Sequence, residues 1–258
     1  MLKNIPFSRI WFAVQSLVIP PRLCYNERMN PTLDTVRYSD LISGDKKPLF
    51  ERYFELLREY NARFNLTSIT EKAEVYEKHF LDSVLGESLF PKNAHVLEVG
   101  SGAGFPSLPL KILRGDLNFT LVESTGKKCE FLKVVIEELG FSDVTVLNGR
   151  AEDYARDPVY REQFDVCCAR AVARLNTLSE YCIPFLKVGG VFVAYKADAD
   201  EEVNEAQSAI QKLGGKGAEV FRYSLPSDAK RTLVYIQKQK NTPKCYPRGQ
   251  GKERKNPL

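Results

Sequence analysis

The sequence is poor in the residues that usually bind metal ions. It holds only two histidines, and none of its six cysteines forms a C-x-x-C pair. Protein metal sites of the zinc type need clustered Cys and His side chains, so we expect no metal site. Cys167, Cys168 and Cys182 lie in apolar stretches and are predicted to be small core residues of a cytosolic protein.

Long apolar runs are also missing. The mostly apolar stretch at residues 10–19 follows Lys3 and Arg9 and is ended by Pro20. It is too short to span a bilayer and has no A-x-A-like cleavage site. We therefore expect a cytoplasmic protein without membrane contact. Residues 1–28 are interpreted as a mis-called or disordered extension before a true start at Met29, which the intact mass of the native protein would test.

Charge is low overall but unevenly distributed. The whole chain carries +4, whereas the segment from Lys238 to the end holds seven Lys or Arg against one Glu. The remainder is therefore slightly negative, and the basic character belongs to a C-terminal tail, residues 241–258 with the residues just before them. A basic arm suits a polyanion, although a merely solvated terminus would have the same composition.

A glycine-rich stretch organises the rest of the chain. Residues 95–105 join a short apolar strand to a turn with Gly100, Gly102 and Gly104, and a helical pattern follows at about 105–114. Glycine tolerates positive φ and lets the backbone approach a ligand, and a helix start offers unpaired N–H groups. The third glycine comes one residue earlier than in a dinucleotide fingerprint. This spacing resembles motif I of the class I S-adenosylmethionine (SAM) methyltransferases.

A second strand is expected at residues 118–123, ending at Glu123. A carboxylate at this position can accept both ribose hydroxyls of an adenosine. Because NAD and SAM are both bound in this way, Glu123 alone does not separate the two cofactors.

Beyond residue 95 strands alternate with helices, which predicts a parallel, doubly wound α/β sheet. The last two strands, 218–224 and 231–238, are joined by a short polar loop and should form a hairpin with an antiparallel final strand. The other expected strands are 144–147, 164–169 and 191–196, with a turn at 187–190 before the last of them. Five βα units and a hairpin are the seven-stranded, Rossmann-like arrangement of class I SAM methyltransferases. Ligands of such sheets bind at the carboxyl ends of the strands, so Gly100, Glu123, residues 149–152, Arg170 and Lys196 should gather in one cleft.

The segment before this domain reads as a helical extension. Apolar residues recur at three- and four-residue steps between Leu49 and Tyr60, residues 61–69 are expected to form a loop, and another helix starts near Thr70. His79 and Asp82 are three residues apart and could pair on one helix face. We divide the chain into a helical region at 29–92 and a SAM-binding domain at 93–240.

Six short motifs stand in the order found in one family. They are Asn65-Leu66-Thr67, His79-Phe80-Leu81-Asp82-Ser83, Gly100-Ser101-Gly102-Ala103-Gly104-Phe105-Pro106, Arg150-Ala151-Glu152, Ala169-Arg170-Ala171 and Ala194-Tyr195-Lys196. From about residue 45 onward the chain thereby resembles the RsmG (GidB) methyltransferases, which transfer a methyl group from SAM to N7 of a guanine in 16S rRNA of the small ribosomal subunit. Glu98 and Glu123 stand where Asp is common in that family, and the basic tail differs from its usual, more Pro-rich ending.

The resemblance implies a set of cofactor contacts, namely Gly100, Ser101, Gly102, Gly104, Phe105, Glu123, Ser124, Ala151, Glu152 and Arg170. Guanine N7 carries a lone pair and no proton, so its methylation needs placement rather than a general base. Arg170 and Lys196 are candidates for holding the guanine O6 or a phosphate. A catalytic role for His79 has a weaker case than a bracing one.

Other functions stay open at this point. The chain could be a SAM enzyme acting on another RNA or on a small molecule, an RNA-binding module that keeps the fold, or an NAD-dependent oxidoreductase. The basic tail favours RNA over a small molecule, the intact glycine loop and Glu123 favour an enzyme, and the early third glycine disfavours NAD. We expect a monomer that works on 16S rRNA or the small subunit, with SAM as its cofactor.

Overall fold

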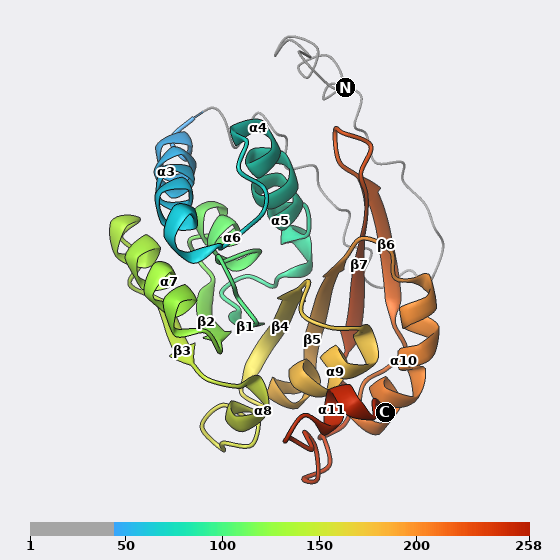
Figure 1. The fold of residues 1–258 in the computed structure, drawn as a ribbon. Coiled ribbons are helices and arrows are strands. Elements are labelled where there is room, and N and C mark those ends of the chain that lie inside the picture. The colour runs from blue at the N-terminus through green and yellow to red at the C-terminus, as the bar shows by residue number, and fades with distance from the viewer. Residues whose placement is uncertain (1–43) are drawn as a thin grey trace.

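Residues 44–258 are described by the structure, a computed structural model. A central sheet separates two groups of helices (Figure 1). The interpretation of residues 1–28 and of Met29 as the start lies outside the described residues, as does the beginning of the helical region predicted at 29–92. Within the described part, no helix is both long and apolar enough to cross a membrane.

The sheet has seven strands in the order β3-β2-β1-β4-β5-β7-β6. Strands β1 to β5 pair in parallel, and β7 runs antiparallel to both β5 and β6. The predicted α/β class and the terminal hairpin are confirmed. The strands are β1 His95–Val99, β2 Asn118–Glu123, β3 Val144–Asn148, β4 Phe164–Arg170, β5 Leu186–Lys196, β6 Glu219–Ser224 and β7 Lys230–Gln237.

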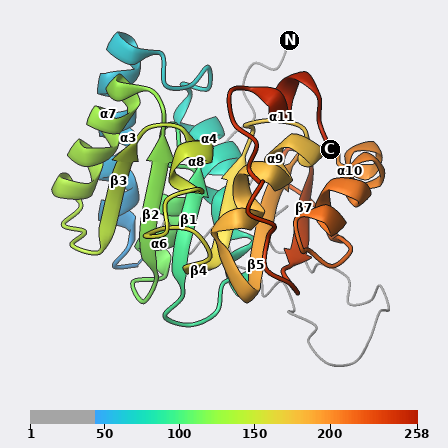
Figure 2. The ribbon, with the colours of Figure 1, turned by 90° about the horizontal axis from the view of Figure 1, so that it is seen from below.

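Helices cover both faces of this sheet (Figures 1 and 2). Those of one face are α3 Lys47–Phe64, α4 Lys72–Val75, η1 Tyr76–Leu81, α5 Asp82–Val84, η2 Glu87–Leu89, α6 Ser107–Leu113 and α7 Gly126–Glu138. Those of the other are α8 Ala151–Tyr154, α9 Leu175–Cys182, η3 Ile183–Phe185 and α10 Asp200–Lys212. Alternation along β4 feeds both cores, since Val166 and Cys168 join the first and Cys167 and Ala169 the second.

Two boundaries differ from the prediction by more than two residues. The expected turn at 187–190 belongs to β5, because that strand starts at Leu186 and its pairing with β4 shifts register between Phe164 and Val166. The loop expected from Asn61 starts later, because α3 continues to Phe64. Ring contacts of Tyr60 with Phe64 and with Phe131 of α7, at 5.7 and 5.6 Å, extend the packed face of α3 by one turn.

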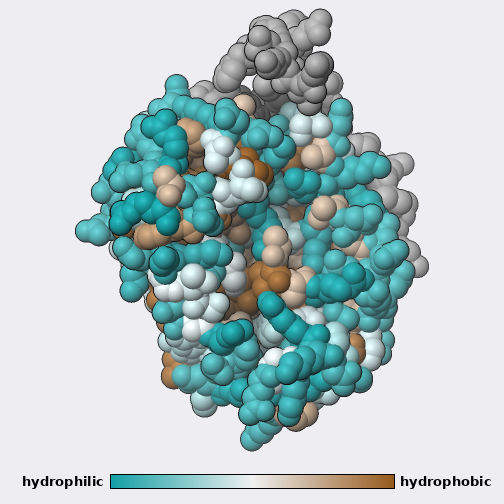
Figure 3. Space-filling view, viewed as in Figure 1, coloured by the Kyte–Doolittle hydropathy of each residue, from teal (hydrophilic) through white to brown (hydrophobic). Residues whose placement is uncertain are grey.

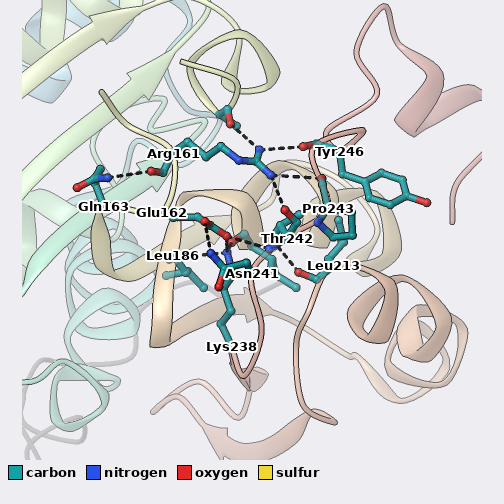
Figure 4. A network of polar contacts seen from close by, with 12 residues as sticks. Arg161, Glu162, Gln163, Leu186, Leu213, Lys238, Asn241, Thr242, Pro243 and Tyr246 are labelled. Atoms are coloured by element: carbon teal, nitrogen blue, oxygen red, sulfur yellow. Dashed lines mark hydrogen bonds and ion pairs between the residues drawn. The ribbon is translucent and has the colours of Figure 1, made fainter. Parts of the chain in front are cut away.

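The C-terminal tail is packed against the domain by polar contacts (Figure 4). The Arg161 guanidinium donates to the carbonyl oxygens of Thr242 and Tyr246, both at 2.8 Å. Glu162 accepts hydrogen bonds from the buried Lys238 ammonium at 2.7 Å and from the Thr242 N–H at 2.8 Å. The start of the tail is therefore held by side chains from the segment that precedes β4.

The end of the tail lies on α9. Arg248 donates from Nη2 to the buried Glu180 carboxylate at 2.7 Å and from Nε at 3.0 Å. The short helix α11, Lys252–Lys255, follows, and the Glu253 carbonyl accepts a hydrogen bond from the Thr177 hydroxyl at 2.9 Å. Two of the seven cations counted in this segment, Lys238 and Arg248, are thus paired inside the protein.

Candidate functional site

The loop between β1 and α6 depends on glycine for its path. Gly100, Gly102 and Gly104 all have positive φ, between 58° and 93°, a region that other residues rarely adopt. A Cβ atom on Gly104 would lie 2.5 Å from the Leu108 side chain and 2.7 Å from the Tyr53 hydroxyl. A Cβ atom on Gly102 would meet nothing closer than 3.8 Å, so the backbone there is open to a ligand.

Glu123 at the end of β2 is joined to this glycine loop. Its buried carboxylate accepts a hydrogen bond from the Gly102 N–H at 2.9 Å through Oε2 and one from the Thr125 N–H at 2.8 Å through Oε1. Each carboxylate oxygen keeps a further lone pair. The side chain is therefore placed to accept two more donors, as a ribose diol would supply.

The residues expected at the adenine edge follow β3. Ala151 and Glu152 begin α8 and are buried. Helix α8 packs against α9. Burial raises the pKa of the Tyr181 phenol of α9, and the negative charge of Glu152 adds to the shift. Of the two serines on the predicted contact list, Ser101 is buried in the loop and Ser124 is exposed after β2. The predicted cofactor contacts from Gly100 to Glu152 thus lie at, or directly after, the carboxyl ends of three neighbouring strands, β1, β2 and β3.

His79 of η1 is held on both ring nitrogens. Nδ1 lies 3.0 Å from Nη2 of Arg170, and Nε2 lies 2.8 Å from the Thr67 hydroxyl oxygen. The ring stacks on Phe105 of the glycine loop, with centroids 4.5 Å apart. Burial lowers the pKa of His79 to about 3, with a further contribution from the positive charge of Arg170. The imidazole is therefore neutral at physiological pH.

Asp82 does not pair with His79. Its carboxylate accepts hydrogen bonds from Arg170 at 3.3 Å and from the Tyr223 hydroxyl at 2.7 Å, and it lies 3.4 Å from Nε of Arg231. Because η1 is a π-helix, its wider turn does not align residues three apart as an α-helix would. Asp82 instead connects the end of β4 to the β6–β7 hairpin.

The two cations proposed to hold the substrate lie at different strand ends. Arg170 at the end of β4 donates to the Lys78 carbonyl at 3.2 Å, and its guanidinium lies 5.0 Å from the centre of the Phe105 ring. Lys196 at the end of β5 donates to the Ala173 carbonyl at 2.6 Å and to Glu202 at 2.7 Å. The structure therefore brings Arg170 together with His79 and Phe105, whereas Lys196 contacts residues that follow β4 and lie in α10.

The surface above these strand ends is hollowed. Near the middle of the face seen in Figure 3, less polar side chains line a depression surrounded by hydrophilic surface. In the same view, this depression lies between the part built by α3 to α7 and the part built by α8 to α11. Such a concave, partly apolar site with a few polar groups suits a small organic ligand.

The model of the rRNA small subunit methyltransferase G family (GidB) matches residues 46–233 of this chain. The chain belongs to this family. The "Ribosomal RNA small subunit methyltransferase G" of Lactococcus lactis subsp. lactis is 49% identical over 224 residues, covering 85% of this chain and 94% of the relative. The protein of the same name from Lactobacillus delbrueckii subsp. bulgaricus is 48% identical over 239 residues, covering 89% of this chain and 100% of the relative.

Solved structures agree with the methyltransferase G family at the level of the fold. An O-methyltransferase from Bacillus cereus in complex with SAH superimposes with a TM-score of 0.55 at 18% identity, covering 78% of this chain and 94% of that one. Cofactor-bound Rv0187 from MTB gives a TM-score of 0.57 at 18% identity, covering 84% and 100%. The class I SAM methyltransferase fold predicted from the strand order is thereby confirmed.

One polar residue of this methyltransferase G chain was not predicted as part of the site. Glu98 in β1 is completely buried, and burial raises the pKa of its carboxyl to about 8. Oε2 accepts a long hydrogen bond of 3.4 Å from the Ser107 N–H, while Oε1 has no partner among the described residues. A buried polar atom without a partner calls for an explanation, and Glu98 stands in the strand that leads into the glycine loop. Its sequence signal is a carboxylate inside an otherwise apolar strand.

Proposed function

We propose that this protein transfers the methyl group of SAM to N7 of a guanine in the 16S rRNA of the small ribosomal subunit. The chief support is membership of the rRNA small subunit methyltransferase G family, whose model spans residues 46–233. The site is consistent with this proposal, because Glu123, proposed to bind the ribose of SAM, is hydrogen-bonded to Gly102 of the glycine loop, proposed to bind its methionine end. We further propose that the enzyme is cytoplasmic and acts as a monomer.

The residues that follow the strand ends fit SAM. Glycine backbone stands where the methionine end would approach, Glu123 where the ribose would lie, and the start of α8 where the adenine would lie. The residues proposed to hold the cofactor are Gly100, Ser101, Gly102, Gly104, Phe105, Glu123, Ser124, Ala151, Glu152 and Arg170. SAM supplies a methyl group bound to a positively charged sulfur atom.

The chemistry asked of the protein is placement. Guanine N7 attacks with a lone pair, so no group has to remove a proton before transfer, and alignment supplies the acceleration. The surroundings of His79 agree with this, because both ring nitrogens are already engaged and the pKa of the ring is lowered to about 3. We assign His79 the role of bracing Thr67 and Phe105 rather than of a base.

Arg170 and Lys196 are proposed to bind the substrate through the hydrogens they have left. Arg170 uses three of its N–H groups within the protein and Lys196 two, out of five and three, respectively. Lys196→Ala should therefore slow rRNA methylation at unchanged SAM affinity, and Arg170→Ala should slow methylation and also weaken SAM binding. The control is Arg174→Ala, which removes an exposed cation that pairs with Glu205. Full methylation activity in both variants would contradict the assignment.

Transfer of labelled methyl from SAM to unmodified small subunits and to stripped rRNA, with the modified nucleotide mapped, tests the function. Label on N7 of one guanine is the expected result, and the better of the two substrates would show whether ribosomal proteins form part of the recognised surface. SAM binding without label on either substrate would move the function to another RNA or to a small molecule.

A further inference from the structure

The Thr67 hydroxyl lies at the edge of the cluster formed by His79, Phe105 and Arg170. Thr67 belongs to the loop between α3 and α4, and its backbone is fixed by Asn61, whose side chain accepts from the Thr67 N–H at 2.8 Å and donates to the Thr67 carbonyl at 2.9 Å. The residue is only half-buried. Its side chain is therefore held in place while part of its surface stays accessible.

Hydrogen-bond counting leaves one donor on this side chain. Arg170 can only donate, so Nδ1 of His79 must accept, and the single proton of the neutral ring is then on Nε2. Nε2–H donates to the Thr67 hydroxyl oxygen at 2.8 Å, and the Ile69 N–H donates to the same oxygen at 3.1 Å. Both lone pairs of that oxygen are occupied, and no acceptor for the hydroxyl hydrogen is found among residues 44–258.

We propose that the Thr67 hydroxyl donates a hydrogen bond to O6 of the target guanine and thereby helps to select guanine. On a guanine, O6 lies beside N7 on the same edge, so a base whose N7 faces the methyl group brings O6 to the protein groups around that point. Phe105, on which the His79 ring stacks, belongs to the loop proposed to hold SAM. Thr67 stands one hydrogen bond away from that ring.

The charge of the donor favours Thr67 over a cation at this position. The purine ring becomes positive as the methyl group arrives, and the sulfonium is positive before it leaves. A hydroxyl held by a neutral imidazole adds no charge beside either group, whereas an ammonium or guanidinium would repel both. Arg170, which contacts the other nitrogen of the His79 ring, then remains available for a phosphate. The occupied lone pairs of Thr67 also prevent it from accepting a hydrogen bond from the N6 amine of an adenine.

This inference rests on the proposed function, and a comparison of two bases tests it separately. Small subunits are reconstituted with either guanine or 2-aminopurine, which lacks O6, at the mapped nucleotide. The ratio of kcat/KM on guanine to that on 2-aminopurine is measured for wild type, Thr67→Val and Thr67→Ser. Since 2-aminopurine changes the reactivity of N7 equally for all three enzymes, differences between their ratios report on the protein.

One lost hydrogen bond should lower the ratio for Thr67→Val by about tenfold relative to wild type, whereas Thr67→Ser, which keeps the hydroxyl, should retain the wild-type ratio. Loss of the acceptor for His79 and Ile69 in Thr67→Val slows both substrates alike and cancels. An unchanged ratio in Thr67→Val, whatever its overall rate or SAM affinity, would overturn the inference alone. Absence of methylation of the guanine by wild type would remove both the inference and the proposed function.

Discussion

Replacing Arg248 by alanine should destabilise the protein by releasing the C-terminal tail from α9. The Arg248 guanidinium donates to both oxygens of Glu180, whose side chain is only 1% exposed. Removal of the arginine leaves a buried carboxylate without its counter-charge, a change that costs roughly 3–5 kcal/mol. The Arg248 backbone N–H still donates to Glu180 at 2.8 Å, and we therefore expect the lower end, about 3 kcal/mol.

Urea unfolding of wild type and variant measures this loss, and Arg174→Ala is the matched control. Arg174 forms an ion pair of the same 2.7 Å length with Glu205, but the two side chains are 55% and 47% exposed, so its removal should cost only about 0–1 kcal/mol. Adding Glu180→Gln to Arg248→Ala should recover part of the loss, because the buried charge is then gone. Equal destabilisation by Arg248→Ala and Arg174→Ala would refute the reasoning.

Three further predictions concern the proposed cofactor site and its surroundings. Between pH 5 and pH 8 the free energy of unfolding of Glu98→Gln should rise relative to that of wild type, by up to about 1.4 kcal/mol per pH unit. The reason is that the folded pKa of Glu98, about 8, lies above its unfolded value, so ionisation of Glu98 destabilises the wild-type fold. Urea unfolding at both pH values checks this, and a pH-independent difference would contradict it. Gly104→Ala should lower the melting temperature more than Gly140→Ala, since both glycines have positive φ but a Cβ meets neighbours only at Gly104; equal losses would show that the contacts with Leu108 and Tyr53 do not matter. The methyl-transfer rate should show no step near pH 6.5 that depends on His79, because its pKa is about 3; such a step, lost in His79→Asn, would be the contrary result.

The fold could be predicted because its information is local. Most strands contain a short apolar segment bounded by glycine or polar residues, and the alternation with helices predicts that β1 to β5 are parallel. Residues at strand ends, such as Gly100 and Glu123, could be assigned to the site for the same reason. The start of β5 could not be predicted, because the glycines at 189 and 190 are typical of a turn although the strand continues through them.

The pairing of polar side chains could not be predicted, because partners lie far apart in the chain. Nothing near Arg170 indicates that it meets His79, 91 residues earlier, and nothing in the tail indicates that Arg248 meets Glu180 of α9. Isolated charges in a sequence look alike whether they are solvated or buried. Glu98 shows this most clearly. Its burial can be predicted from its position in the central strand, whereas the missing hydrogen-bond partner of its Oε1 atom is evident only from the three-dimensional structure.

Equilibrium binding of SAM to wild type and to Glu123→Gln tests the proposed cofactor site most directly. Gln keeps the size of the side chain but turns one acceptor oxygen into an NH₂ donor, which cannot accept a ribose hydroxyl. We predict that wild type binds SAM and not NAD, and that Glu123→Gln binds SAM at least about tenfold more weakly, the value of a lost hydrogen bond to a charged group. Equal affinity of the two proteins for SAM, or binding of NAD in preference to SAM, would contradict the account.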